Sequence, residues 1–190
     1  MRSILLVLGL LFAAPAVAQV SVAVTTQADQ TRTMAHEIVI PAAPDAVWQA
    51  VATIEGWKSW AVPSAWAKAD DADSFESSYS LDGSPGAASN ITNRFIARLP
   101  GRIAVFHTTR TPDGFPHAAD YKRVISFFEI MPREGGTLVR LTGTGYAAGK
   151  AGDDLIGFFR EGNRASLESL RDRFVKGPVD WKAKLAKRDP

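Results

Sequence analysis

The chain has 190 residues, a length that suits one globular domain with terminal extensions. Its 22 lysine and arginine residues nearly balance its 20 aspartate and glutamate residues, so the net charge of +2 does not supply the concentrated basic face of a nucleic-acid-binding protein. The sequence contains no cysteine, which excludes disulfide bonds, thiol catalysis and anchoring through a lipidated cysteine of this chain.

Residues 1–18 have the pattern of a secretory signal peptide. Arg2 supplies a positive charge, residues 4–12 form an apolar run, and the small residues Ala16 and Ala18 form a small-x-small cleavage site. We therefore expect cleavage after Ala18 and a periplasmic or secreted location. No stable membrane insertion is expected after cleavage, because the apolar run is short for a membrane span. The alternatives are an uncleaved anchor and a buried N-terminal strand.

Residues 19–33 are small and polar apart from a brief alternation, and we expect an N-terminal linker or a loose edge segment there. The domain should begin near residue 34, where alternating polarity predicts a strand at 34–40. Pro44 suits a first helical position, and the apolar residues after it recur at helical spacing until Gly56, which we expect to end the helix.

Alternating polarity and turn residues predict five further strands. They span residues 74–81, 90–99, 102–110, 121–130 and 137–146. Asp-Gly, Pro-Gly and Gly-Gly pairs separate several of them, as is typical of tight turns. Consecutive strands joined by short turns favour an antiparallel meander.

The sequence period then changes from two to three or four. Apolar residues between 153 and 175 form a helical stripe, and the Gly-Pro pair at 177–178 ends it. A long amphipathic helix after a run of strands predicts an α+β fold, with a curved antiparallel sheet of about six to seven strands around the C-terminal helix. The basic tail at 177–190 should be disordered or packed on the surface, with contact to anionic lipids as the alternative.

The order of strand, helix, tryptophan-containing turn, antiparallel strands and long final helix resembles the SRPBCC superfamily. This START-type, helix-grip group includes plant pollen-allergen-like proteins, polyketide cyclases and heat-shock-chaperone activators. The resemblance is carried by IVIPAAPDAVW at 38–48, GWKSW at 56–60 and GGTLVRLT at 135–142, and it covers residues 34–176. It implies an apolar cavity between sheet and helix that holds lipids, sterols, polyketides or similar molecules. It carries over no catalytic residue and no cofactor.

Alternation also predicts which sheet face points toward the long helix. The ligand-binding residues expected on that face and on the helix are Asn93, Phe95, Val105, His107, Ser126, Phe128, Leu141, Phe158, Phe159 and Asn163. An apolar lining with a few polar groups is the usual composition of a small-molecule site. The polar members of the sheet face can equally be satisfied core groups or lie at the mouth of the barrel.

His107 is the one candidate for acid or base catalysis, because histidine is the side chain that most readily titrates near neutral pH. The other histidines, His36 and His117, are not paired with it at helical ligand spacing. A zinc site normally needs three or four ligands. We therefore expect no metal and no cofactor.

Residues 143–148 match the G-x-G-x-x-A dinucleotide fingerprint. That motif requires a second parallel strand after the helix, and the chain all but ends with the helix. We therefore interpret Gly143 and Gly145 as residues that let the last strand bend. Gly157 and Gly162 interrupt the helix, either as tolerated surface glycines or where a ligand or the sheet approaches closely.

These observations favour an exported protein that binds a small hydrophobic or amphipathic molecule without transforming it. One alternative is a cyclase or dehydratase acting on a polyketide-like substrate, with His107 moving protons. Another is a protein-interaction module, although the sequence identifies no protein partner.

Overall fold

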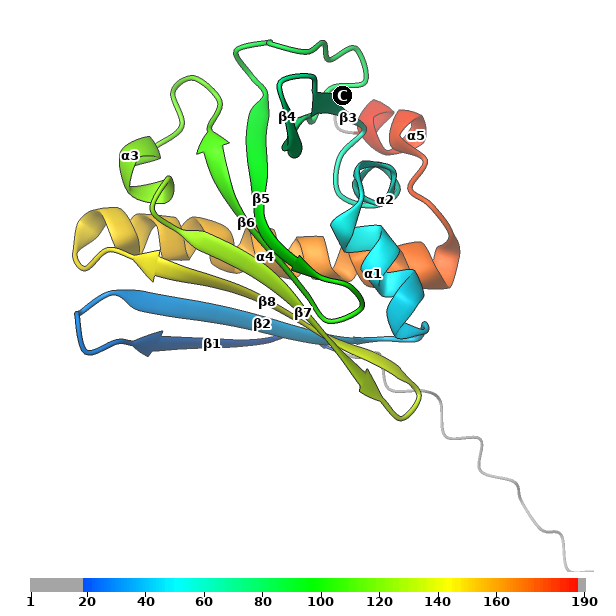
Figure 1. The fold of residues 1–190 in the computed structure, drawn as a ribbon, viewed down its shortest axis with the longest axis horizontal. Helices are drawn as coiled ribbons and strands as arrows, with labels where there is room; N and C mark the ends of the chain where they lie inside the picture. Colours follow the sequence, from blue (N-terminus) through cyan, green and yellow to red (C-terminus); the bar gives the residue numbers. More distant parts are fainter. Residues whose placement is uncertain (1–18, 188–190) are drawn as a thin grey trace, which may run out of the picture.

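The computed structural model describes residues 19–187, so the predicted signal peptide at 1–18 lies outside the described residues. The described chain has an α+β fold in which one antiparallel sheet packs against a long helix, α4, as the helix-grip prediction requires (Figure 1). The sheet has eight strands in the order β1-β2-β8-β7-β6-β5-β4-β3. Apart from the pairing of β2 with β8, neighbouring strands are also consecutive in the chain.

The strands and helices have the following bounds. The strands are β1 (Ser21–Thr26), β2 (Arg32–Ile40), β3 (Ser64–Lys68), β4 (Asp71–Ser78), β5 (Ile91–Leu99), β6 (Ile103–Arg110), β7 (Ile125–Arg133) and β8 (Gly136–Tyr146). The helices are α1 (Pro44–Ala52), α2 (Ile54–Lys58), α3 (Ala118–Tyr121), α4 (Lys150–Lys176) and α5 (Trp181–Ala186).

Local chemistry sets the helix boundaries near the N-terminal end of the domain. Pro44 occupies the first turn of α1, where its missing N–H costs nothing. The Thr53 hydroxyl caps α2 by accepting a hydrogen bond from the Gly56 amide at 3.0 Å. Gly56 was expected to end the first helix, but it lies inside α2. A Cβ there would come within 2.1 Å of the Gln49 carbonyl, so glycine allows α1 and α2 to approach closely.

Three segments differ from their expected structure. The expected linker at 19–33 contributes β1, an edge strand paired with β2, which agrees with the edge-segment alternative. β3 is an additional edge strand that alternation did not predict. Residues 118–121 form the short helix α3, so β7 begins only at Ile125.

The apolar stripe of α4 packs against the inner face of the sheet. Leu155, Ile156, Leu167 and Leu170 are its buried large side chains. Each contributes about 1.5–3 kcal/mol when fully withdrawn from water. The buried residues near the two ends of the helix belong to two separate apolar clusters, so the centre of α4 lies above a gap between them.

The described part of the basic tail, residues 177–187, packs on the surface of the domain. The Trp181 indole donates a hydrogen bond to the Lys58 carbonyl at 2.6 Å, and the Val179 amide donates to the Ser59 carbonyl at 3.0 Å. Both contacts fasten the start of α5 to the end of α2. Among residues 19–187, no helix is both long and apolar enough to cross a membrane.

Candidate functional site: a cavity between the sheet and α4

A cavity of about 340 Å³ lies between the inner face of the sheet and the centre of α4. The sheet contributes Ser126 of β7 and Leu141 of β8, and the helix contributes Gly162 and Asn163. The volume is within the range of sites that hold drug-sized molecules. The cavity therefore occupies the gap that the two apolar clusters leave open.

Aromatic rings form the apolar wall of the cavity. Trp57 contacts Phe106 edge-on with ring centroids 5.6 Å apart, and Trp60 contacts Phe128 in the same manner at 6.2 Å. The Trp60 indole also donates a hydrogen bond to the Ala50 carbonyl at 2.8 Å. These tryptophans therefore hold the fold together and line the cavity at once.

A second aromatic group lines the cavity where the loop after β6 meets α4. Tyr121 stacks on Phe159 with ring centroids 4.5 Å apart, and Phe115 contacts Phe158 edge-on at 5.7 Å. Phe158 is 57% exposed, so this group reaches the surface of the protein. We call these four residues the rim cluster.

Polar side chains interrupt the apolar lining at defined points. The buried Thr108 hydroxyl donates to the Asn93 side-chain oxygen at 2.8 Å and lies 3.4 Å from the Tyr121 hydroxyl. The Ser126 hydroxyl and the Asn163 amide also line the cavity. Neither makes a hydrogen bond to another side chain or backbone group between residues 19 and 187, so both are available to a bound molecule.

The lining side chains are all apolar or uncharged and polar. Burial raises the pKa of Tyr121 above its usual range, and the contact with Thr108 only partly opposes this effect. Burial also raises the pKa of Tyr146, which lines the same cavity. Both phenols therefore remain protonated at neutral pH and can donate hydrogen bonds.

Seven of the ten predicted ligand-binding residues line the cavity. They are Asn93, Ser126, Phe128, Leu141, Phe158, Phe159 and Asn163. Their contact with a ligand remains a prediction. Phe95 also points inward, but it packs between Phe75 and Phe106 instead of lining the cavity.

Val105 and His107 were placed on the wrong face of the sheet. A bulge at Ile96 shifts the β5–β6 register by one residue, so that Phe95 pairs with Phe106 instead of His107. A shift of one residue moves side chains to the opposite face of a sheet. His107 therefore lies outside, between Arg94 and Ile125, and is not a catalytic candidate within the cavity.

The residues that take the inward places are Phe106 and Thr108, which sequence reasoning missed. Both faces of the first half of β6 are apolar, so the alternation of this strand had no unique phase. Tyr121 and Tyr146 were missed for a different reason. Tyr121 lies in a helix where a strand was expected, and Tyr146 follows a second bulge in β8.

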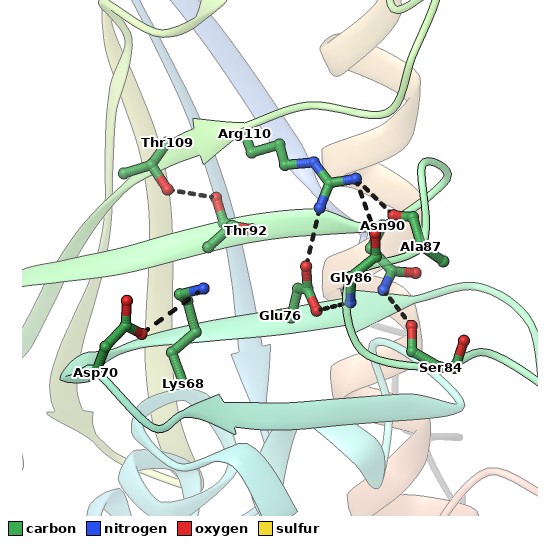
Figure 2. A network of polar contacts seen from close by, with 10 residues as sticks. All are labelled: Lys68, Asp70, Glu76, Ser84, Gly86, Ala87, Asn90, Thr92, Thr109 and Arg110. Atoms are coloured by element: carbon green, nitrogen blue, oxygen red, sulfur yellow. Dashed lines mark hydrogen bonds and ion pairs between the residues drawn. The ribbon is translucent and has the colours of Figure 1, made fainter.

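An ion pair between the buried Glu76 carboxylate and the partly exposed Arg110 holds the loop between β4 and β5 beside the cavity (Figure 2). Glu76 accepts hydrogen bonds from Arg110 at 3.0 Å and from the Gly86 amide at 2.7 Å. Arg110 also donates to the Ala87 carbonyl at 2.6 Å. The loop follows Tyr79, a lining residue, so this network fixes one side of the cavity.

The described residues contain no cluster of three or more histidine, aspartate or glutamate side chains placed to hold a metal ion. The cavity itself offers amide and hydroxyl groups, without the carboxylate and imidazole ligands that divalent metals prefer. The arrangement is therefore suited to binding an organic molecule by apolar contact and a few hydrogen bonds.

Comparison with known proteins supports this assignment of the fold. Residues 31–175 match the model of the family described as polyketide cyclase/dehydrase and lipid transport. A search of curated proteins found no match.

Several solved structures have the same fold at low sequence identity. The Aha1 dimer from Colwellia psychrerythraea is 18% identical, with a TM-score of 0.58 over 76% of this chain and 97% of that chain. CalU16 from Micromonospora echinospora is 15% identical, with a TM-score of 0.60 over 88% of this chain and 80% of that one. Protein MLL2253 from Mesorhizobium loti is 18% identical, with a TM-score of 0.58 over 84% and 99%.

Proposed function

Because this chain belongs to the polyketide cyclase/dehydrase and lipid transport family, within the SRPBCC superfamily, we propose that it binds a small hydrophobic or amphipathic molecule between its sheet and α4. The observation that carries the proposal is the cavity of about 340 Å³, which has aromatic walls and a few polar side chains. A tightly filled core would give the fold no room for a ligand.

The enzyme alternative relied on His107 to move protons inside the cavity. His107 lies on the opposite face of the sheet, so the cavity lacks the acid–base group on which this alternative depended. A filled core with a large exposed apolar patch would have favoured the protein-interaction alternative. The open space beneath α4 favours a small molecule instead.

A pair of glycines in α4 provides a matched test. Gly162 lines the cavity, whereas Gly157 lies one and a half turns earlier on the same helix and does not. A Cβ at either position would have no heavy atom within 4 Å, so the first side-chain atom is accommodated at both. The two positions therefore differ mainly in their access to the cavity.

We expect Gly162→Phe to weaken the binding of the uncharged apolar dye N-phenylnaphthylamine by about tenfold or more, because the new ring takes the space of the dye. Gly157→Phe should bind the dye like the wild type. Fluorescence titration measures both affinities, and circular dichroism checks that both variants fold. Equal binding by all three proteins, or no binding by the wild type, would contradict the proposal.

Export is a separate part of the proposal, supported by the signal pattern at residues 1–18. Cleavage after Ala18 would retain Val20, which packs into the main apolar cluster, and all of β1. N-terminal sequencing of protein from fractionated cells should find Gln19 first, in the periplasmic or extracellular fraction. An intact Met1 in the cytosolic fraction would refute export.

A further inference from the structure

An irregularity near the end of β8 turns the side chain of Tyr146 toward the cavity. The side chain of Thr144 points outward, where its hydroxyl lies 2.8 Å from that of Thr33. Strict alternation would therefore also turn Tyr146 outward. The pairing register shifts there, with Thr33 opposite Thr144 and Arg32 opposite Tyr146, so Gly145 is an extra residue. This bulge reverses the alternation and turns Tyr146 inward.

Both glycines of the 143–148 motif are needed for this arrangement. Gly145 has a φ of +90°, a backbone conformation that residues with a side chain rarely adopt. The Tyr146 hydroxyl lies 2.6 Å from the position that a Cβ would take at Gly143, so any side chain at 143 would displace it. Gly143 pairs with Ser126 on β7, which lines the cavity. The hydroxyl therefore lies on the cavity-lining face of the sheet.

The Tyr146 hydroxyl makes no hydrogen bond within the described part of the chain, although the residue is only 2% exposed. Among the described residues, the side-chain atoms that are fully enclosed without a partner do not include this hydroxyl, so it is open to the space of the cavity, where a bound molecule can take its hydrogen bond. The hydroxyl stays protonated at neutral pH, so it has a hydrogen to donate that no group of the described chain accepts. A bound molecule with an acceptor oxygen would satisfy this donor.

The lining also restricts the charge of that molecule. On the cavity side Tyr146 meets Phe159 and other uncharged lining groups, whereas Arg32, opposite it in the sheet, does not line the cavity and is paired with Asp153. A carboxylate or phosphate that entered the cavity would lose its hydration and would find no cation there to pair with, which is strongly unfavourable. A carbonyl oxygen would accept the Tyr146 hydrogen bond at little desolvation cost.

We propose that the Tyr146 hydroxyl is the anchoring donor of the site, and that the natural ligand is an uncharged molecule with an acceptor oxygen, such as a ketone or quinone, on an apolar ring system. This inference rests on the proposed function, because it requires a ligand in the cavity. It also gives the two glycines of the 143–148 motif a role, because both are needed to place Tyr146.

Three naphthalene probes test the proposal by competition with N-phenylnaphthylamine. Acetylnaphthalene carries a ketone, ethylnaphthalene lacks the oxygen, and naphthoate carries a charge. In Tyr146→Phe the ratio of ketone affinity to hydrocarbon affinity should fall about fivefold from its wild-type value, as expected for one lost hydrogen bond. Naphthoate should bind the wild type at least about tenfold more weakly than the ketone at neutral pH.

Tyr79→Phe is the matched control, because Tyr79 also lines the cavity but is 61% exposed and can bond to water. It should keep the wild-type ratio. Tyr146→Phe should unfold at a temperature no lower than the wild type, since its hydroxyl has no protein partner. The inference about Tyr146 would be overturned, and the proposed function left standing, by any of three results. These are an unchanged ratio of ketone to hydrocarbon affinity in Tyr146→Phe, a lower unfolding temperature of that variant, or naphthoate binding equal to that of the ketone. If no probe binds the wild type, the proposed function falls as well.

Discussion

At the scale of single residues, His36 is the most unusual group outside the cavity. It is fully buried beneath α4, where its Nε2 atom lies 3.0 Å from the Arg160 carbonyl. The carbonyl can only accept, so Nε2 carries the proton of the neutral ring. The Nδ1 atom is buried and has no partner in the described structure. A second proton on this ring would therefore be neither hydrated nor paired.

Burial under α4 lowers the pKa of His36 below its ordinary value of 6.5, and the bond to the Arg160 carbonyl only partly opposes this. The nearby charges of Arg160 and Glu161 act in opposite directions. Below about pH 6.5 the unfolded chain therefore binds a proton that the folded protein excludes. The free energy of unfolding should fall as the pH drops through this range, by up to about 1.4 kcal/mol per pH unit.

Urea titrations at pH 7.5 and 5.5 measure this effect. We expect His36→Gln to lose less stability than the wild type between the two pH values, because its side chain does not titrate. His107→Gln, on the outer face of the sheet, should retain the wild-type dependence. The explanation fails if His36→Gln and the wild type lose equal stability.

At the scale of elements, the loop between β4 and β5 depends on the ion pair of Glu76 with Arg110 (Figure 2). Glu76→Ala removes the acceptor of the Gly86 amide and leaves Arg110 without its carboxylate. The Glu76 side chain is 8% exposed, so the loss should cost about 1–3 kcal/mol of stability. Hydrogen exchange of residues 80–90 should become faster, and mass spectrometry can follow it.

The pair of Arg98 with Asp73 supplies the comparison, because both of its side chains are substantially exposed. Asp73→Ala should cost about 0–1 kcal/mol, as is usual for a surface pair, and should leave exchange in the loop unchanged. Equal costs for the two substitutions would show that Glu76 does not hold the loop.

The strands also show where sequence reasoning succeeds and where it stops. Alternation and turn residues predicted most strands. Gly and Pro mark turns because their backbone preferences come from their own covalent structure and hold whatever residues surround them. The bulges at Ile96 and Gly145 could not be read in this way. The bulge at Ile96 contains no glycine, and it shifts the register so that Phe95 pairs with Phe106 instead of His107. Gly145 was visible in the sequence, but only tertiary pairing shows that it redirects Tyr146.

At the scale of the whole molecule, α4 is fastened at both ends and spans the cavity between them. Near its start, Arg32 bonds to Asp153 and to the Ala147 carbonyl. Near its end, the Ser169 hydroxyl donates to the Trp60 carbonyl at 2.7 Å. The helix-grip arrangement followed from the order and period of the elements, whereas the volume left beneath α4 depends on how individual side chains pack.

The uncharged lining has a consequence for the energetics of ligand exchange. No side chain of the cavity changes its protonation between about pH 6 and 8, so an uncharged ligand would enter and leave without taking up or releasing protons. Calorimetric heats should then be identical in phosphate and Tris, whose ionisation enthalpies differ, and affinity should be insensitive to ionic strength. Loading and unloading would follow the supply of ligand alone, unaffected by the acidity or salinity of the surrounding medium in this range.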